Sequence, residues 1–176
     1  QGRHAEAEAV LREALDLSVR HFGPEHEETT IWSMAALARS LEAQGKHVEA
    51  EQIAKQVLGF ALAAARTAGA SPQKLNDAAR RLLFTEFPAL RDVPLAMELA
   101  TEANRRTEFT NSSFLYTLAQ CHMASGDSAR AREQWNQAFA QLPDEQARSA
   151  RLNAAAWWLL GLPPDEPRDS QLALEF

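Results

Sequence analysis

The stretch QGRHAEAEAVL at residues 1–11 is written almost unchanged as QGKHVEAEQIA at residues 44–54, 43 residues further along. Apolar residues recur at intervals of three and four along nearly the whole chain, whereas the alternation typical of strands is almost absent, and this periodicity predicts helices. A repeat with a period of 20–50 residues indicates a solenoid, in which each helical hairpin buries its apolar face on the next. The sequence therefore predicts an all-α repeat fold.

Helix-breaking residues divide the chain into helices joined by short loops. Ser71-Pro72 offers an N-cap followed by proline at the first helical position, and Gly126-Asp127 offers a stop followed by an N-cap. Helices joined by loops of a few residues pack as antiparallel neighbours. We expect helices over residues 3–21, 28–44, 47–69, 72–85, 92–106, 111–124, 127–141 and 145–160.

The clearest copy of the repeat is SSFLYTLAQCHMASGDSARAREQWNQAFAQLPDE at residues 112–145. Small residues in it let two helices approach to about 8–10 Å, and bulky residues fill the space between them. Counted as a 34-residue unit, it resembles a tetratricopeptide repeat and departs from that family only at His122, where an aromatic residue is preferred. The matching residues are Leu115, Leu118, Ala119, Gly126, Ala131, Trp135, Ala138 and Pro143.

The rest of the chain resembles the same family. The linker FGPEHEETT at residues 22–30 is similar to that of kinesin light chain-type repeats, so the N-terminal half resembles that subtype. The resemblance implies a right-handed α-solenoid of antiparallel helical hairpins, with about three and a half repeats, over residues 1–161. Its expected parts are a half-unit at 1–21, units at 28–69, 72–106 and 111–143, a helix at 145–161 that is either a cap or a fifth first helix, and a tail at 162–176.

Composition and charge narrow the function. The net charge of −6 leaves no basic footprint for nucleic acid and no polybasic strip for anionic lipid, so neither partner is expected. Cys121 is the single cysteine, which excludes an internal disulfide framework and makes a reducing, cytoplasmic compartment the simpler expectation. The chain does not begin with Met, and we expect it to be an excised fragment of a larger protein.

Catalysis, metal binding and cofactors are not expected. His21 and His26 are separated by Gly23-Pro24, so they do not form a metal pair on one helical face. His122 has the place of a core residue, and the adjacent Cys121 is expected to point away from the interface between the two helices. The sequence has no glycine-rich phosphate loop, GxSxG or HExxH motif. We therefore expect a non-catalytic protein.

The family resemblance implies a concave groove lined by the first helix of each repeat. Arg39 and Arg80 hold the same place in successive repeats, so they are expected along one wall. Aromatic and amide side chains beside them suit an acidic or aromatic–acidic peptide. The alternative is that both arginines pair with neighbouring carboxylates and only keep the groove soluble. The groove residues carried over by count are Trp32, Arg39, Asn76, Arg80, Tyr116 and Gln120.

Two functions remain open. The first is a protein–protein interaction scaffold that binds a partner peptide, within a larger bacterial regulatory protein of the kind in which such repeats are combined. The second is a structural spacer or self-association module. In the second reading the half-unit at 1–21 lacks its first helix, and its apolar face is expected to be exposed and to dimerise. That face carries Ala7, Leu11, Ala14 and Leu15.

Overall fold

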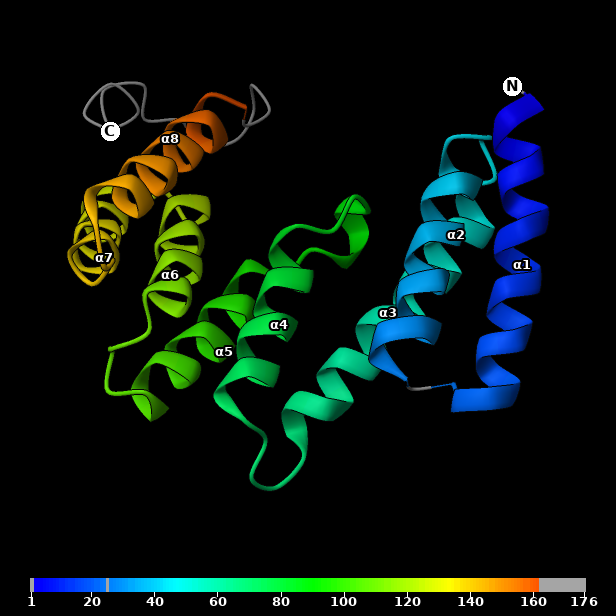
Figure 1. The fold of residues 1–176 in the computed structure, drawn as a ribbon, viewed down its shortest axis with the longest axis horizontal. Coiled ribbons are helices and arrows are strands. Elements are labelled where there is room, and N and C mark those ends of the chain that lie inside the picture. Colours follow the sequence, from blue (N-terminus) through cyan, green and yellow to red (C-terminus); the bar gives the residue numbers. More distant parts are fainter. Residues whose placement is uncertain (1, 25, 162–176) are drawn as a thin grey trace. The chain divides into compact units, whose positions relative to one another are not determined.

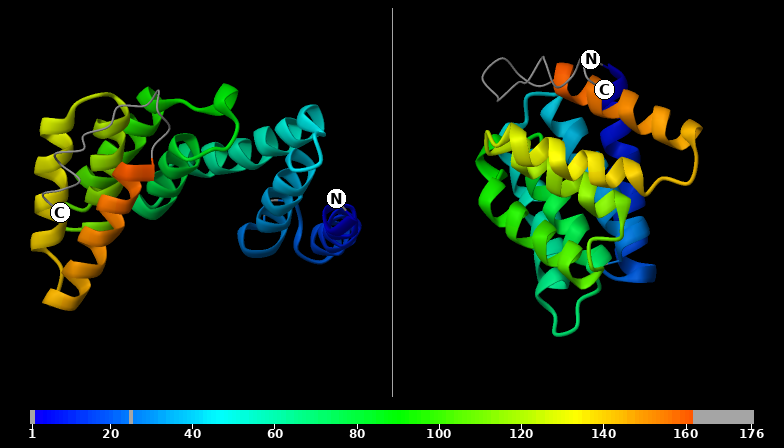
Figure 2. Two further views of the ribbon diagram at one scale, coloured as in Figure 1. Left: turned by 90° about the horizontal axis from the view of Figure 1, so that it is seen from above. Right: turned by 90° about the vertical axis from the view of Figure 1, so that its left-hand side faces the viewer.

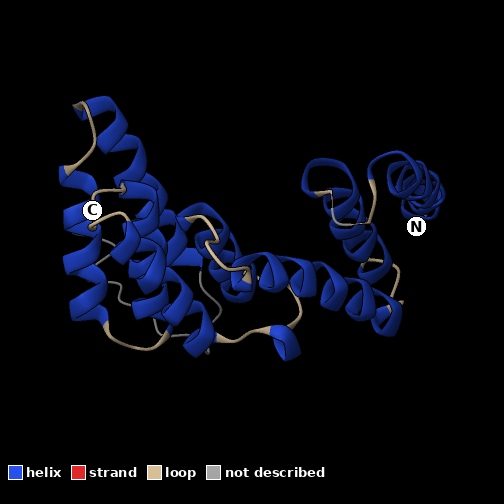
Figure 3. Cartoon of the chain, turned by 90° about the horizontal axis from the view of Figure 1, so that it is seen from below, coloured by secondary structure: helices blue, strands red, loops and turns tan. Residues whose placement is uncertain are grey.

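The computed structural model describes residues 2–24 and 26–161, and their regular structure is entirely helical (Figures 1 and 3). The predicted all-α repeat fold of helical hairpins is confirmed. The expected tail at 162–176 and the side chains of Trp157 and Trp158 lie outside the described residues. The α-helices are α1 (Gly2–Phe22), α2 (Trp32–Glu42), α3 (His47–Arg66), α4 (Pro72–Leu83), α5 (Val93–Arg106), α6 (Ser112–Ala124), α7 (Ser128–Ala140) and α8 (Glu145–Gly161).

The helix boundaries differ from the expected ones mainly in the first part of the chain. The helix expected over 28–44 begins as a π-helical turn, Glu27–Ile31, and α2 itself ends at Glu42. The chain then turns through Gly45, whose φ of +77° is unfavourable for other residues. The helix expected over 47–69 stops at Arg66, ahead of Gly69 with φ of +79°.

Two predicted caps are confirmed by hydrogen bonds. The Ser71 hydroxyl accepts from the backbone N–H of Lys74, with Pro72 at the start of α4. The Asp127 carboxylate accepts from the N–H of Arg130 at 3.1 Å and begins α7. A short 3₁₀ turn, Pro88–Leu90, separates α4 from α5.

The chain forms two compact units. Unit 1 contains residues up to 66 together with 86–90, and unit 2 contains residues 67–85 and those from 91 onward. Unit 1 is built from α1, α2 and α3, and unit 2 from α4 to α8. Figure 2 shows α6, α7 and α8 of unit 2 lying side by side.

The core of unit 1 corrects one expectation about α1. Leu11 and Leu15 are half-buried against Leu37 and Leu41 of α2, so this face of the helix is not exposed. Ala7 and Ala14 are also half-buried. The face is covered because the hairpin of α2 and α3 packs against it. The further residues of this cluster are Ala50, Ile53 and Phe87.

A network of charged groups also joins α1 to the hairpin. The Glu8 carboxylate accepts hydrogen bonds from Gln44 at 2.9 Å and from Lys46 at 2.6 Å, both in the turn after α2. Arg12 pairs with Glu8 at 2.9 Å and with Glu49 of α3 at 2.5 Å. We call these five residues the Glu8 network.

Unit 2 has larger buried side chains. Trp135 is 0% exposed and Phe139 is 2% exposed, and both pack against Ala119 and Ala131. This confirms the prediction that bulky side chains pack against small ones between α6 and α7. Ala155 of α8 joins the same cluster. Cys121 was expected to point away from the α6–α7 interface and His122 to be core. The structure buries Cys121 fully, which does not contradict the first expectation, because α6 also contacts α4 and α5. His122 is only half-buried, so its expected place in the core is corrected.

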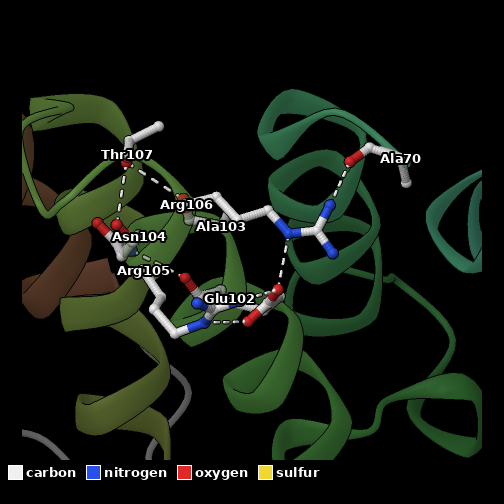
Figure 4. A network of polar contacts seen from close by, with 8 residues as sticks. Ala70, Glu102, Ala103, Asn104, Arg105, Arg106 and Thr107 are labelled. Carbon is white, nitrogen blue, oxygen red and sulfur yellow. Dashed lines mark hydrogen bonds and ion pairs between the residues drawn. The ribbon is translucent and has the colours of Figure 1, made fainter. Parts of the chain in front are cut away.

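Polar contacts connect the helices of unit 2 at the C-terminal end of α5 (Figure 4). Asn104 is fully buried, and its Nδ2 donates to the carbonyls of Ala100 at 2.9 Å and of Phe114 in α6 at 3.0 Å. Arg106 donates to the carbonyl of Ala70 at 2.5 Å and to the Glu102 carboxylate at 2.7 Å. The loop before α4 and the start of α6 are therefore both tied to α5.

Candidate functional site

Unit 2 contains a cleft of about 300 Å³ between α4, α6 and α8. A volume of this size lies at the small end of ligand pockets, so it suits a few side chains rather than a long segment. We call it the arginine cleft, because arginines from two different helices line it. Its lining residues are Arg80 and Phe84 of the α4 region, Ser113, Tyr116, Thr117 and Gln120 of α6, and Arg151 of α8.

Tyr116 forms the aromatic part of the arginine cleft. Its ring lies 6.2 Å from the ring of Trp135 and 6.5 Å from that of Phe139, so the core of unit 2 fixes its position. The Arg151 guanidinium stands 5.7 Å from the Tyr116 ring centroid, within the range of a cation–π contact. The Tyr116 ring thereby helps to place a positive charge at the cleft.

Both arginines of the cleft affect the pKa of the Tyr116 phenol. Burial raises the pKa of the Tyr116 phenol, while the positive charges of Arg151 and Arg80 act in the opposite direction. The phenol is neutral at pH 7, because its pKa lies above its ordinary value of 10.0. Tyr116 therefore offers a neutral hydroxyl and an aromatic face between two cations.

The two arginines of the cleft are exposed and have no carboxylate partner among the described residues. Arg105 and Arg106, by contrast, both pair with Glu102 at 2.7 Å. The alternative in which Arg80 is neutralised by a neighbouring carboxylate is thus not what the described part of the chain shows. A carboxylate from elsewhere would find unpaired guanidinium groups here.

The remaining surface of the cleft is mixed. Phe84 is 40% exposed, which is high for a phenylalanine, and it offers an apolar contact beside Arg80. Gln120 and Thr117 are buried at 6% and 2% exposure, and their side chains supply polar groups in the cleft wall. Charged, amide and aromatic groups together suit a short peptide segment with one carboxylate and one apolar side chain.

The predicted groove residues fall into three groups. Arg80, Tyr116 and Gln120 line the arginine cleft. Trp32 and Arg39 lie on unit 1, where they share one face of α2, and Trp32 is 64% exposed. Asn76 is 2% exposed and is not among the residues lining the cleft, although the count had placed it in the groove.

Sequence counting did not single out Arg151. The last helix is expected to be either a cap or a further first helix, and the six groove residues carried over by count include none from it. The helical spacing could have indicated Arg151, because Ala155 is fully buried and Arg151, four positions earlier, lies on the same face of α8. That signal depends on knowing which face of α8 is covered, and the alanine-rich sequence of the helix does not reveal it.

Other candidates for chemistry are weak. Burial raises the pKa of the Cys121 thiol to about 12, so it holds little thiolate at neutral pH. Burial lowers the pKa of His122. The Nδ1 of His21 contacts the carbonyl of Leu17, and that of His26 contacts the Thr29 hydroxyl. Over residues 2–24 and 26–161, no cluster of three His, Cys, Asp or Glu side chains is placed to hold a metal ion.

No helix in the described part of the chain has the length and apolar character needed to cross a bilayer.

Comparison with known proteins gives a match to a family model. No curated protein and no solved structure matches the chain. A family model described as tetratricopeptide repeat matches residues 1–63, which cover α1, α2 and most of α3. Residues 1–63 are therefore similar to tetratricopeptide repeats, and the all-α hairpin architecture of the described residues is of the kind that such repeats form.

Proposed function

We propose that the chain is a non-catalytic protein–protein interaction scaffold, and that the arginine cleft binds an acidic or aromatic–acidic segment of a partner protein. Tetratricopeptide repeats generally mediate such interactions, which sets the class of function. The proposal extends to Trp32 and Arg39 as a second contact surface on α2.

The observation that carries the proposal is that Arg80 and Arg151 lie in one cleft without a carboxylate partner among the described residues. Two guanidinium groups from different helices line one cleft, and no carboxylate of the described residues pairs with either. Guanidinium groups bind carboxylates through charge-assisted hydrogen bonds, which are stronger than neutral ones. Phe84 and Tyr116 add an apolar contact beside them, so the preferred ligand combines a carboxylate with an apolar or aromatic neighbour.

The test is binding of acidic and aromatic–acidic peptides to the full chain, measured by fluorescence anisotropy. In the variant Arg80→Glu/Arg151→Glu we expect the affinity to fall by at least tenfold, since one charged hydrogen bond contributes about 1.5–3 kcal/mol. The matched control is Arg130→Glu/Arg148→Glu, which makes the same charge change on exposed arginines of unit 2 outside the cleft. Equal loss in both variants, with unchanged circular dichroism, would show nonspecific attraction and reject the cleft.

Self-association is the second candidate, and one observation favours it. Val10 is 65% exposed and Leu17 is 45% exposed, and their spacing of seven places both on one face of α1. A second copy of the chain is the occupant proposed for this face. Sedimentation velocity of the full chain over a range of concentrations tests it. A dimer that Val10→Asp/Leu17→Asp converts to monomer would support this candidate, and a monomer at all concentrations would reject it.

A further inference from the structure

The arginine cleft has a chemically matched segment within the same chain. The tail at residues 162–176 reads LPPDEPRDSQLALEF and carries Asp165, Glu166, Asp169 and Glu175 against the single cation Arg168. The cleft brings two arginines to the surface of a chain whose overall charge is negative. Opposite charge on the cleft and the tail favours their association.

We propose that the tail docks in the arginine cleft of its own chain, with the Glu175 carboxylate held between Arg80 and Arg151. The inference rests on the proposed function, because it assigns an occupant to the same cleft. The tail then competes with outside partners, and a partner peptide must displace it.

The small size of the cleft indicates which carboxylate of the tail enters it. About 300 Å³ admits a few adjacent side chains, so the carboxylate and the apolar side chain that enter must be close in sequence. In the tail, only Glu175 has large apolar residues on both sides, Leu174 and Phe176. The other three carboxylates lie among proline, arginine and serine residues. One of the two apolar side chains packs against Phe84 and Tyr116.

The length of the tail is sufficient for this contact. Along α8, from Arg151 to its end at Gly161, the chain rises ~15 Å. From there to residue 175, an extended chain can span ~45 Å, because each residue advances about 3.3–3.6 Å. The tail can therefore turn back along α8 and reach the cleft, with the prolines at 163, 164 and 167 forming part of the connection.

Tethering makes a weak contact effective. A short linker gives an effective concentration on the order of 1 mM. A docked tail with a free Kd of about 0.1 mM would then weaken the binding of an outside peptide about tenfold. Removing the docked contact should tighten partner binding by the same factor.

The single tyrosine and the buried cysteine allow a direct measurement in the full chain. Tyr116 is the only tyrosine, so selective isotope labelling of tyrosine makes its ring resonances report on the cleft without overlap. Cys121 is 0% exposed with a pKa of about 12, so a thiol-reactive nitroxide introduced through Ser170→Cys labels the tail selectively. We expect paramagnetic broadening of the Tyr116 resonances that is independent of protein concentration.

Charge reversal then identifies the contact. We expect Glu175→Arg to abolish the broadening, and the combined variant Glu175→Arg/Arg151→Glu to restore it. The matched control is Glu166→Arg, which makes the same charge change at a carboxylate that the proposal leaves outside the cleft, and it should retain most of the broadening. Where Arg151→Glu alone lowers helicity, Arg80→Glu takes its place, because Arg80 is the other arginine proposed to hold Glu175.

Each result separates the tail contact from the proposed function. Absence of broadening in the wild type, or its loss to the same degree in Glu166→Arg, overturns tail docking. Broadening only between copies in a mixture of nitroxide-labelled and isotope-labelled chains also overturns it, in favour of a contact in trans. Acidic peptides that bind equally well with and without Glu175→Arg overturn the competition while leaving the proposed function standing. Broadening in a protein that binds no outside peptide, even after Glu175→Arg, supports tail docking and rejects the proposed function.

Discussion

Unit 1 and unit 2 hold their helices together in different ways. In unit 1 the half-buried Leu11 and Leu15 and the exposed Glu8 network attach α1 to its neighbours. In unit 2 the fully buried Trp135 fills the space between α6 and α7, and the buried Asn104 connects α5 to α6. The first arrangement depends on surface charge and therefore on pH and salt, whereas the second depends on packing.

The largest expected effect comes from the core of unit 2. Replacing Trp135 with alanine should destabilise unit 2 by about 3–5 kcal/mol, because a fully buried aromatic side chain is lost and a cavity remains. Hydrogen exchange resolved along the chain measures this, with protection in α6 and α7 falling well below that in α2 and α3. Uniform loss of protection across both units would break the comparison, because it would show that they unfold as one.

Asn104 should give an intermediate effect. Asn104→Ala removes two hydrogen bonds in a fully buried position, including the one that joins α5 to α6, and should cost about 1–3 kcal/mol in urea unfolding. Thr107→Ala is the matched control, since the Thr107 hydroxyl bonds only to carbonyls of the preceding turn, of Ala103 and Asn104 (Figure 4). An equal loss in both variants would mean that the bond to Phe114 contributes nothing.

The Glu8 network should make unit 1 sensitive to acid. Hydrogen bonds from Lys46 and Gln44, with Arg12 close by, lower the pKa of Glu8 from its ordinary value of 4.5 to about 2. Because its pKa is lowered on folding, the Glu8 carboxylate stabilises the folded state fully above about pH 4.5. This stabilisation is lost as the pH falls towards 2 and the carboxylate becomes protonated in the folded state. We expect Glu8→Gln to lower the protection of α1 at pH 7 and to match the wild type near pH 2.

Glu102 is the control for this prediction in unit 2. Arg105 and Arg106 also lower its pKa to about 2, but both lie on the same helix as Glu102. Glu102→Gln should therefore affect the end of α5 without separating helices. If Glu102→Gln reduced protection across α6 as strongly as Glu8→Gln reduces it in α1, the distinction between the two units would be wrong.

These contacts show how far the sequence predicts the molecule. The places of Ala119 and Ala131 in the repeat predicted that each would be a small residue in a close contact between helices, and both are 0% exposed. The spacing of small and large residues along a helix is a local feature, so a single sequence is enough to predict which of them pack closely. Whether Glu8 meets Lys46, or whether Arg151 faces the cleft, depends on the rotation of one helix against another. A long charged side chain fits many such rotations, and its sequence position does not distinguish among them.

The smallest expected effect concerns the turns, where the two units also differ. Unit 1 turns between α2 and α3 through Gly45, with φ of +77°. Unit 2 turns between α5 and α6 through Glu108 and Phe109, with φ of +51° and +56°. The carbonyl of Phe109 accepts a hydrogen bond at 2.8 Å from the side chain of Gln141, the C-cap residue of α7, so the left-handed backbone is held from outside the turn.

Glu108→Gly should therefore stabilise unit 2 slightly. A residue with a side chain costs about 1–2 kcal/mol in the left-handed region, and glycine returns about 0.5–1 kcal/mol of that through its more flexible unfolded state. The net gain should be about 0.5 kcal/mol, seen as a higher urea midpoint at unchanged slope. Glu108→Ala keeps the side-chain penalty and removes only the exposed carboxylate, so it should leave the midpoint near the wild-type value. A midpoint raised equally by alanine and glycine would show that the charge of Glu108, rather than its backbone conformation, limits the turn in unit 2.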